Sequence, residues 1–137
     1  MNLTEHKSMI LNLIVLAKKY SVYKFKIESA LPEWIYSSDF YSITRTKDEL
    51  SVVAIQNDPI SEDIICSKDW RIIKIAGPLD FSLIGVIADI TNIFKEEKIP
   101  ILTISTHDTD YILVKQKDLN IGIKALSDKG HKISIEK

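Results

Sequence analysis

The chain has 137 residues, of which 45% are hydrophobic and 27% are charged, and its formal net charge is −1. This length suits one domain of average size or two small ones that share a core. The hydrophobic share excludes a disordered chain. The balanced charge gives no basis for binding nucleic acid or an anionic membrane.

The first apolar run, residues 9–17, is far shorter than the roughly 20 residues that cross a bilayer. Glu5 precedes the run, and Lys18 and Lys19 follow it with no small-residue cleavage site, unlike a signal peptide. We therefore interpret this run as a buried strand and expect a cytoplasmic protein.

The first half of the chain, residues 1–60, has an irregular pattern. Strands are predicted at residues 10–16, 20–27, 40–45 and 50–55, and Pro32 is well placed to begin a short helix. Polar residues then mark a connector over residues 61–69, with a second short helix predicted at 61–66. If this half repeats the fold of the second, it is a degenerate copy.

The second half, residues 70–137, begins with a predicted strand at residues 70–76 that ends at Gly77-Pro78. Asp80 or Ser82 can cap the helix that follows. Apolar residues recur in this helix at helical spacing, namely Leu83, Val86, Ile87, Ile90 and Phe94. Pro100 prevents the helix from continuing.

The remaining elements complete a known arrangement. Strands are predicted at residues 101–105, 110–115 and 132–136. A helix capped by Asp118 precedes the last strand, with Leu119, Ile123 and Leu126 on its inner face and Gly130 just beyond its end. The order strand, helix, strand, strand, helix, strand predicts a ferredoxin-like α+β fold.

Cysteine and histidine are too sparse for the common disulfide and metal motifs. Cys66 is the only cysteine, which excludes an internal disulfide and a cysteine-based zinc site. His6, His107 and His131 lie far apart in the sequence. The sequence contains no GxSxG, P-loop, HExxH or Rossmann glycine pattern, so we expect neither an enzyme nor a cofactor.

Three stretches carry a resemblance to a known family: residues 40–54 (FYSITRTKDELSVVA), 70–90 (WRIIKIAGPLDFSLIGVIADI) and 104–115 (ISTHDTDYILVK). Together they resemble small tandem ACT-domain proteins, related to the ACT modules of CASTOR-type arginine sensors and of aspartate kinases. The resemblance covers most of the chain, from Leu11 to His131, and includes no kinase domain. It implies two ferredoxin-like ACT-type units packed together, the first one degenerate.

The resemblance also implies a regulatory protein that holds a free amino acid, or a similar small zwitterion, at an interface between ACT units. The loop after the first strand would line the site with Gly77, Pro78, Leu79, Asp80, Phe81, Ser82 and Leu83. The turn after the second strand would add Ser105, Thr106, His107, Asp108, Thr109 and Asp110. The main alternative is a ligand-independent interaction module that dimerises through its sheet edges; the third is an enzyme built on Asp80 and the turn.

The chemistry of these residues fits a zwitterion, but each also has a structural explanation. Backbone N–H groups at a helix start suit a carboxylate, and Gly77 lets a ligand approach closely. Asp80 either pairs with a ligand ammonium or caps the helix. Asp108 or Asp110 would take the cation, unless the turn uses its polar side chains on local backbone. His107 either tunes binding near neutral pH or is an exposed turn residue.

Overall fold

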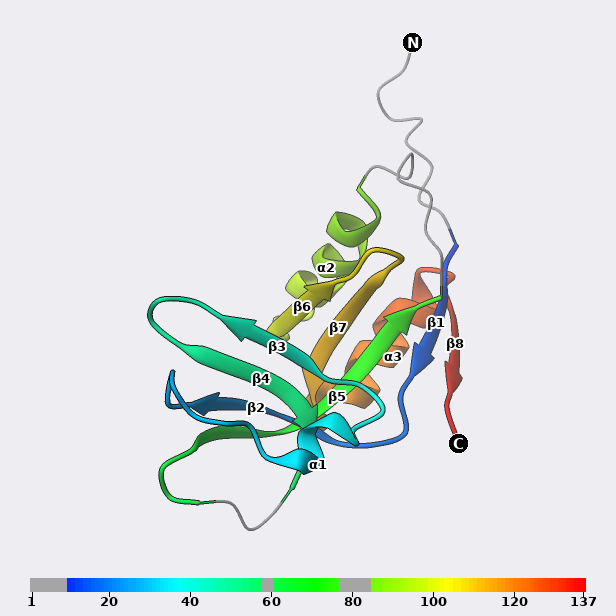
Figure 1. The fold of residues 1–137 in the computed structure, drawn as a ribbon. Coiled ribbons are helices and arrows are strands. Elements are labelled where there is room, and N and C mark those ends of the chain that lie inside the picture. The colour runs from blue at the N-terminus through cyan, green and yellow to red at the C-terminus, as the bar shows by residue number, and fades with distance from the viewer. Residues whose placement is uncertain (1–9, 58–60, 77–84) are drawn as a thin grey trace. The chain divides into compact units, whose positions relative to one another are not determined.

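The computed structural model describes residues 10–57, 61–76 and 85–137. The chain divides into two compact units. Lys18–Arg71 forms one, which we call the inserted unit; the chain up to Ala17 joins Ile72–Lys137 in the other, which we call the main unit. Figure 1 shows the elements of both.

The main unit contains a five-stranded sheet. Its strands are β1 (Asn12–Val15), the end of β5 (Ile65–Ile75), β6 (Ile101–Ser105), β7 (Asp110–Lys115) and β8 (Lys132–Ile135), in the order β6-β7-β5-β1-β8. β1 is antiparallel to β5 and parallel to β8, so that Leu13 lies opposite both Ile75 and Ile133. The elements from β5 to β8 follow the predicted order of the second half.

The first strand corrects the predicted division into residues 1–60, 61–69 and 70–137. We expected residues 10–16 to belong to the first half, but β1 pairs with β5 and β8 and separates them. Alternating apolar residues indicate that a strand is buried, but not which strand it pairs with. Because Ile75 and Ile133, the partners of Leu13, lie 62 and 120 positions along the chain, only the tertiary structure reveals the pairing.

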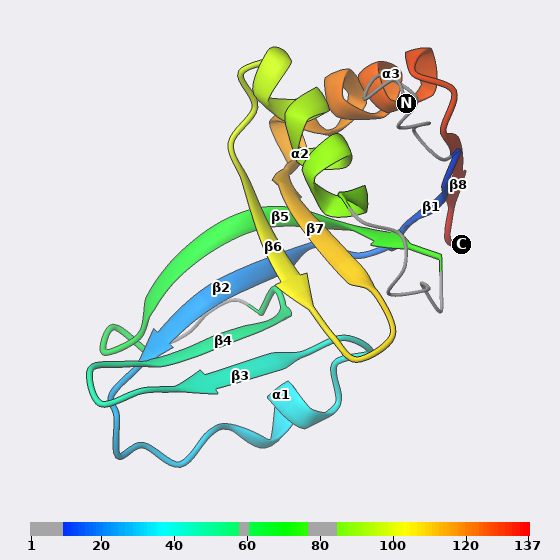
Figure 2. The ribbon, with the colours of Figure 1, turned by 90° about the horizontal axis from the view of Figure 1, so that it is seen from above.

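Two helices cover one face of this sheet (Figure 2). They are α2 (Val86–Glu96) and α3 (Leu119–Asp128), the latter preceded by the short 3₁₀ helix η2 (Gln116–Asp118). Their apolar faces meet the sheet in a core that includes Leu13, Val15, Ile73, Ile75, Val86, Ile90, Phe94, Ile112, Val114, Leu119 and Leu126. The predicted helical spacing is therefore confirmed for the described residues.

The ends of α3 test two predictions. Gly130 has a φ of 94°, in the left-handed region expected of a residue that ends a helix. Asp118 precedes the helix, but its side chain makes no capping hydrogen bond. The residues before Asp118 form a 3₁₀ turn rather than an extended approach to the helix, so this predicted cap is wrong.

The inserted unit is an antiparallel sheet in the order β3-β4-β2-β5. It comprises β2 (Tyr20–Phe25), α1 (Glu33–Tyr36), β3 (Ser42–Arg45), β4 (Leu50–Ile55) and the start of β5. Ile35 of α1 packs with side chains of β2 and β4 in its core. The strands and the helix after Pro32 appear close to their predicted places.

β5 begins where a connector was expected. A turn occupies residues 62–63 and the strand starts at Ile65, so the predicted helix at 61–66 is wrong. Ser67, Lys68 and Asp69 are exposed, and because they are polar, the sequence did not indicate a strand here.

The α+β class with two units is confirmed. No helix in the described part of the chain is long and apolar enough to cross a membrane.

Candidate functional site

The predicted loop from Gly77 to Leu83, including Pro78, Leu79, Asp80, Phe81 and Ser82, lies outside the described residues. Its described flanks are the end of β5 and Gly85. Gly85 has a φ of 83°, a conformation that glycine adopts readily. Its carbonyl accepts a hydrogen bond of 2.8 Å from the Asp89 N–H, the first bond of α2. The loop therefore joins the end of β5 to the start of α2.

The predicted turn joins β6 to β7. Ser105 ends β6, Asp110 begins β7, and the two lie opposite each other in the strand register. The Thr106 N–H and its hydroxyl both donate to the Thr109 carbonyl, at 2.8 and 3.1 Å. The Thr109 N–H in turn donates to the Thr106 hydroxyl at 3.3 Å. These two threonines close the turn on itself, as the structural explanation requires.

Thr109 also links the turn to β5. Its side chain is buried, and its hydroxyl donates to the Ile75 carbonyl. Ile75 is the last residue of β5 and lies two positions before Gly77. The turn is therefore fixed to the strand that leads into the predicted loop. The sequence placed both segments in one site only through the family resemblance.

The charged residues of the turn lie on its surface. The His107 ring Nδ1 is 2.7 Å from the Asp108 carboxylate, with 91% and 71% of the two side chains exposed. The Ser105 hydroxyl donates to the Asp110 carboxylate. A carboxylate oxygen accepts more than one hydrogen bond. Asp108 and Asp110 can therefore bind a ligand ammonium while they keep these partners.

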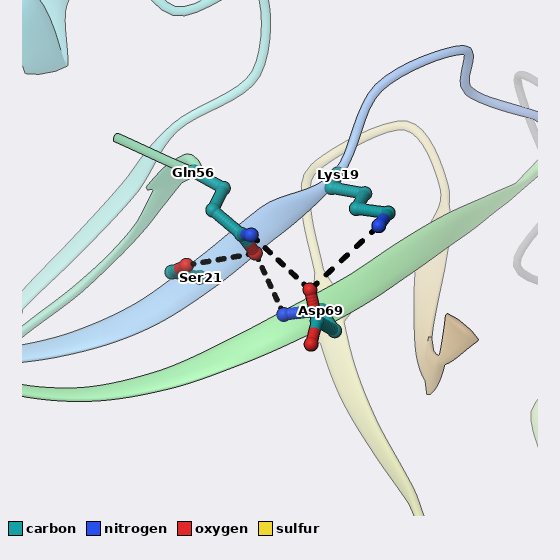
Figure 3. Close-up of polar contacts among 4 residues, drawn as sticks. All are labelled: Lys19, Ser21, Gln56 and Asp69. Atoms are coloured by element: carbon teal, nitrogen blue, oxygen red, sulfur yellow. Dashed lines mark hydrogen bonds and ion pairs between the residues drawn. The ribbon is translucent and has the colours of Figure 1, made fainter. Parts of the chain in front are cut away.

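A second polar cluster, which the sequence did not predict, lies in the inserted unit (Figure 3). The Gln56 amide accepts from the Asp69 N–H at 2.7 Å and from the Ser21 hydroxyl at 3.3 Å, and it donates to the Asp69 carboxylate at 3.1 Å. The Lys19 ammonium lies 3.8 Å from the same carboxylate.

This cluster stabilises a β-bulge. Tyr20 lies opposite Trp70, whereas Val22 lies opposite Ser67, so one residue of β2 faces two of β5. Asp69 takes up the irregularity with a φ of 65°, a conformation that aspartate tolerates better than most residues. The polar groups satisfy one another, and we assign the cluster a structural role.

Two family models match successive parts of the chain. A family model described as an ACT domain matches residues 65–128. A second, described as an N-terminal domain, matches residues 18–63, which lie within the inserted unit. No curated protein matches the sequence.

Solved structures with this fold include a protein from Agrobacterium tumefaciens that is 31% identical. The match covers 94% of this chain and 96% of that one, with a TM-score of 0.85. A Vibrio cholerae protein, described as a possible transport protein, is 16% identical over 86% of this chain and 88% of that one, with a TM-score of 0.64.

The ligand-free regulatory subunit of aspartate kinase from Thermus thermophilus shares the fold at 11% identity. That match covers 84% of this chain and 95% of that one, with a TM-score of 0.59. The expected similarity to aspartate kinase modules is thus confirmed. From its fold and its ACT match over residues 65–128, we conclude that the chain contains an ACT domain and that it is related to the Agrobacterium protein.

Proposed function

We propose that this chain is a regulatory module that binds a free amino acid or a similar small zwitterion. The observation that carries the proposal is the hydrogen bond from Thr109 to Ile75, because it ties the polar turn to the strand that precedes Gly77–Leu83. The ligand carboxylate would bind backbone N–H groups of that loop. Its ammonium would bind Asp108 and Asp110.

Two further findings support a regulatory role. The ACT match covers the strand, helix and turn that contribute to the proposed site. A relative of the same fold is the regulatory subunit of an aspartate kinase. We propose that the chain likewise binds rather than catalyses, and that it acts in the cytoplasm on a partner protein.

The experiment that tests this proposal is calorimetry and thermal shift of the full chain with each of the twenty amino acids at millimolar concentration. A ligand that binds only the folded state raises the melting temperature by mass action. At a concentration of 100 times its Kd, it adds about 2.7 kcal/mol to the free energy of unfolding. We expect at least one amino acid to do so. No response to any of them would contradict the proposal.

Variants then locate the site. Asp108→Asn combined with Asp110→Asn should weaken binding, because the amide removes the negative charge that faces the ammonium. Asp48→Asn is the matched control, since Asp48 lies in the β3–β4 turn, where the Thr46 hydroxyl accepts hydrogen bonds from the Asp48 and Glu49 N–H groups. Equal affinities for the double variant and the control would place the ligand elsewhere.

The alternative function, a ligand-independent dimerisation module, has its own support. Within residues 10–57, 61–76 and 85–137, β6 pairs only with β7, so its other edge offers backbone groups to a second copy. Leu102 on this strand is 42% exposed. Light scattering with and without amino acids separates the two functions. A dimer that ignores every amino acid favours the module, and a chain that stays monomeric contradicts it.

A further inference from the structure

A cleft of about 190 Å³ opens beside α2, on the main unit. It is lined by Asp89, Asn92, Ile93, Glu96, Lys129 and His131. None of these residues belongs to the proposed loop and turn site. Four come from α2, and the other two flank Gly130 in the turn between α3 and β8.

The α2 wall of the cleft carries acceptors. Asp89, Asn92 and Glu96 are spaced by three and four residues, so they lie on the same side of the helix. The Asn92 amide donates to one oxygen of Glu96 at 3.2 Å and thereby orients this carboxylate. Each carboxylate has acceptor positions beyond its present contacts. This wall therefore suits an ammonium group.

The second wall, formed by the two residues that flank Gly130, carries donors. The buried His131 accepts a hydrogen bond of 3.1 Å at Nδ1 from the Leu11 N–H. Burial lowers the pKa of His131, and the charge of Asp89 offsets this in part. A neutral ring that accepts at Nδ1 carries its proton on Nε2, which makes Nε2 a donor. Lys129 adds an ammonium group, so this wall suits a carboxylate.

Among the described residues, Lys129 forms no ion pair with the carboxylates that line the same cleft, Asp89 and Glu96. Its ammonium thus lies more than 4 Å from the carboxylates of Asp89 and Glu96. With two carboxylates against one ammonium, the cleft disfavours a simple anion. A molecule with a cationic and an anionic end complements both walls.

We propose that this cleft is a second binding site for a small zwitterion such as a free amino acid. The ligand ammonium binds Asp89 and Glu96, and its carboxylate binds Lys129 and the Nε2–H of His131. The inference names the same ligand class as the proposed function but rests on the cleft alone. Because His131 also accepts from the Leu11 N–H, a ligand in the cleft would contact the residue that holds the chain just before β1.

The test is calorimetry of the full chain with the twenty amino acids, repeated on Asp89→Asn and Lys129→Gln. Each variant should weaken the affinity of this site about tenfold, equivalent to about 1.4 kcal/mol. Asp128→Asn and Lys124→Gln are matched controls, because these residues pair with each other on exposed α3 at 2.9 Å. They should leave the affinity unchanged.

The ring signals of His131 in NMR spectra give a second measurement that does not depend on the variants. They should shift on addition of the amino acid that binds, while those of the exposed His107 serve as an internal reference. Binding that neither cleft variant weakens, with no shift at His131, overturns the inference. If the turn variants at Asp108 and Asp110 weaken that binding, the proposed function still stands.

The remaining outcomes are equally decisive. Loss of affinity in the cleft variants but not in the turn variants supports the cleft and overturns the loop and turn site. No binding of any amino acid overturns both. Circular dichroism of each variant shows whether it is folded. Because Lys129 is exposed, Lys129→Gln removes no core contact.

Discussion

Thr109 shows how one side chain serves two parts of the fold. Its neighbours in the turn are exposed, but it is 6% exposed and its hydroxyl reaches a backbone carbonyl of β5. A threonine in a polar turn sequence is typical of local turn chemistry. No local pattern indicated the contact with Ile75, because that partner lies 34 positions away.

Replacing this threonine tests the link. Thr109→Val keeps the shape of the side chain but removes its hydroxyl, so we expect a loss of about 1 kcal/mol in the free energy of unfolding. Chemical denaturation measures it. Thr103→Val, at an exposed position of β6, is the control and should change stability by less than about 0.5 kcal/mol. Equal effects would mean that the hydroxyl contributes nothing.

At the scale of elements, the contact between α2 and α3 depends on a glycine. A Cβ atom at Gly122 would lie 2.8 Å from a ring carbon of Phe94. Phe94 is almost fully buried, with 1% exposed, so its ring has little room to move. Gly122 is therefore required for the close approach of the two helices.

Gly122→Ala sets two effects against each other. Alanine favours a helix over glycine by about 1 kcal/mol, but overpacking a core costs typically about 1–3 kcal/mol. We expect a net loss of stability in thermal or chemical denaturation. Asn120→Ala, at an exposed position of the same helix, should be neutral or stabilising. A Gly122 variant that matches or exceeds the wild type in stability would contradict this account.

The stability contributed by the hydrogen bond between Leu11, just before β1, and His131, just before β8, should depend on pH. His131 accepts from Leu11 only while Nδ1 is unprotonated. Burial holds its pKa below the ordinary value of 6.5, so the folded state binds fewer protons than the unfolded chain. The contribution to stability is then complete above pH 6.5 and is lost as the pH falls below it. Asp89, Glu96 and Lys129 line the adjoining cleft, and Asp89 limits the size of the effect.

Denaturation at pH 7.5 and at pH 5.5 measures this dependence. His131→Asn is the matched variant, because an amide oxygen can accept from the Leu11 N–H but does not titrate in this range. We expect the wild type to lose more stability than the variant between the two pH values. The same loss in both proteins would assign the pH dependence to other groups.

At the scale of the whole molecule, the unfolding of the two units can be followed by two different spectroscopic signals. Trp34 and Trp70 both belong to the inserted unit, whereas the longer helices α2 and α3 belong to the main unit. Tryptophan fluorescence therefore follows one unit, and helical circular dichroism follows the other.

Leu13→Ala tests the place of β1. Leu13 is 1% exposed in the core of the main unit, and its truncation should cost about 2–5 kcal/mol. We expect the midpoint of the helical signal in urea to fall further than that of fluorescence. Val52→Ala, in the core of the inserted unit, should do the reverse. Equal shifts of both signals in both variants would mean that the units unfold as one.

The sequence by itself determined the elements and their order in the second half, because helical spacing and alternation are local patterns that follow the periods of helix and strand. It also placed the polar turn and, through the family resemblance, the fold. It missed the exposed half of β5, where polar residues break the alternation.

Only the tertiary structure decided where β1 pairs and which side chains meet. β1 lies between β5 and β8, and His131 lies with Asp89 and Lys129 around one cleft. These contacts join residues up to 120 positions apart. Strand pairing and side-chain contacts depend on how separate elements pack, and a local sequence pattern does not determine which distant elements meet.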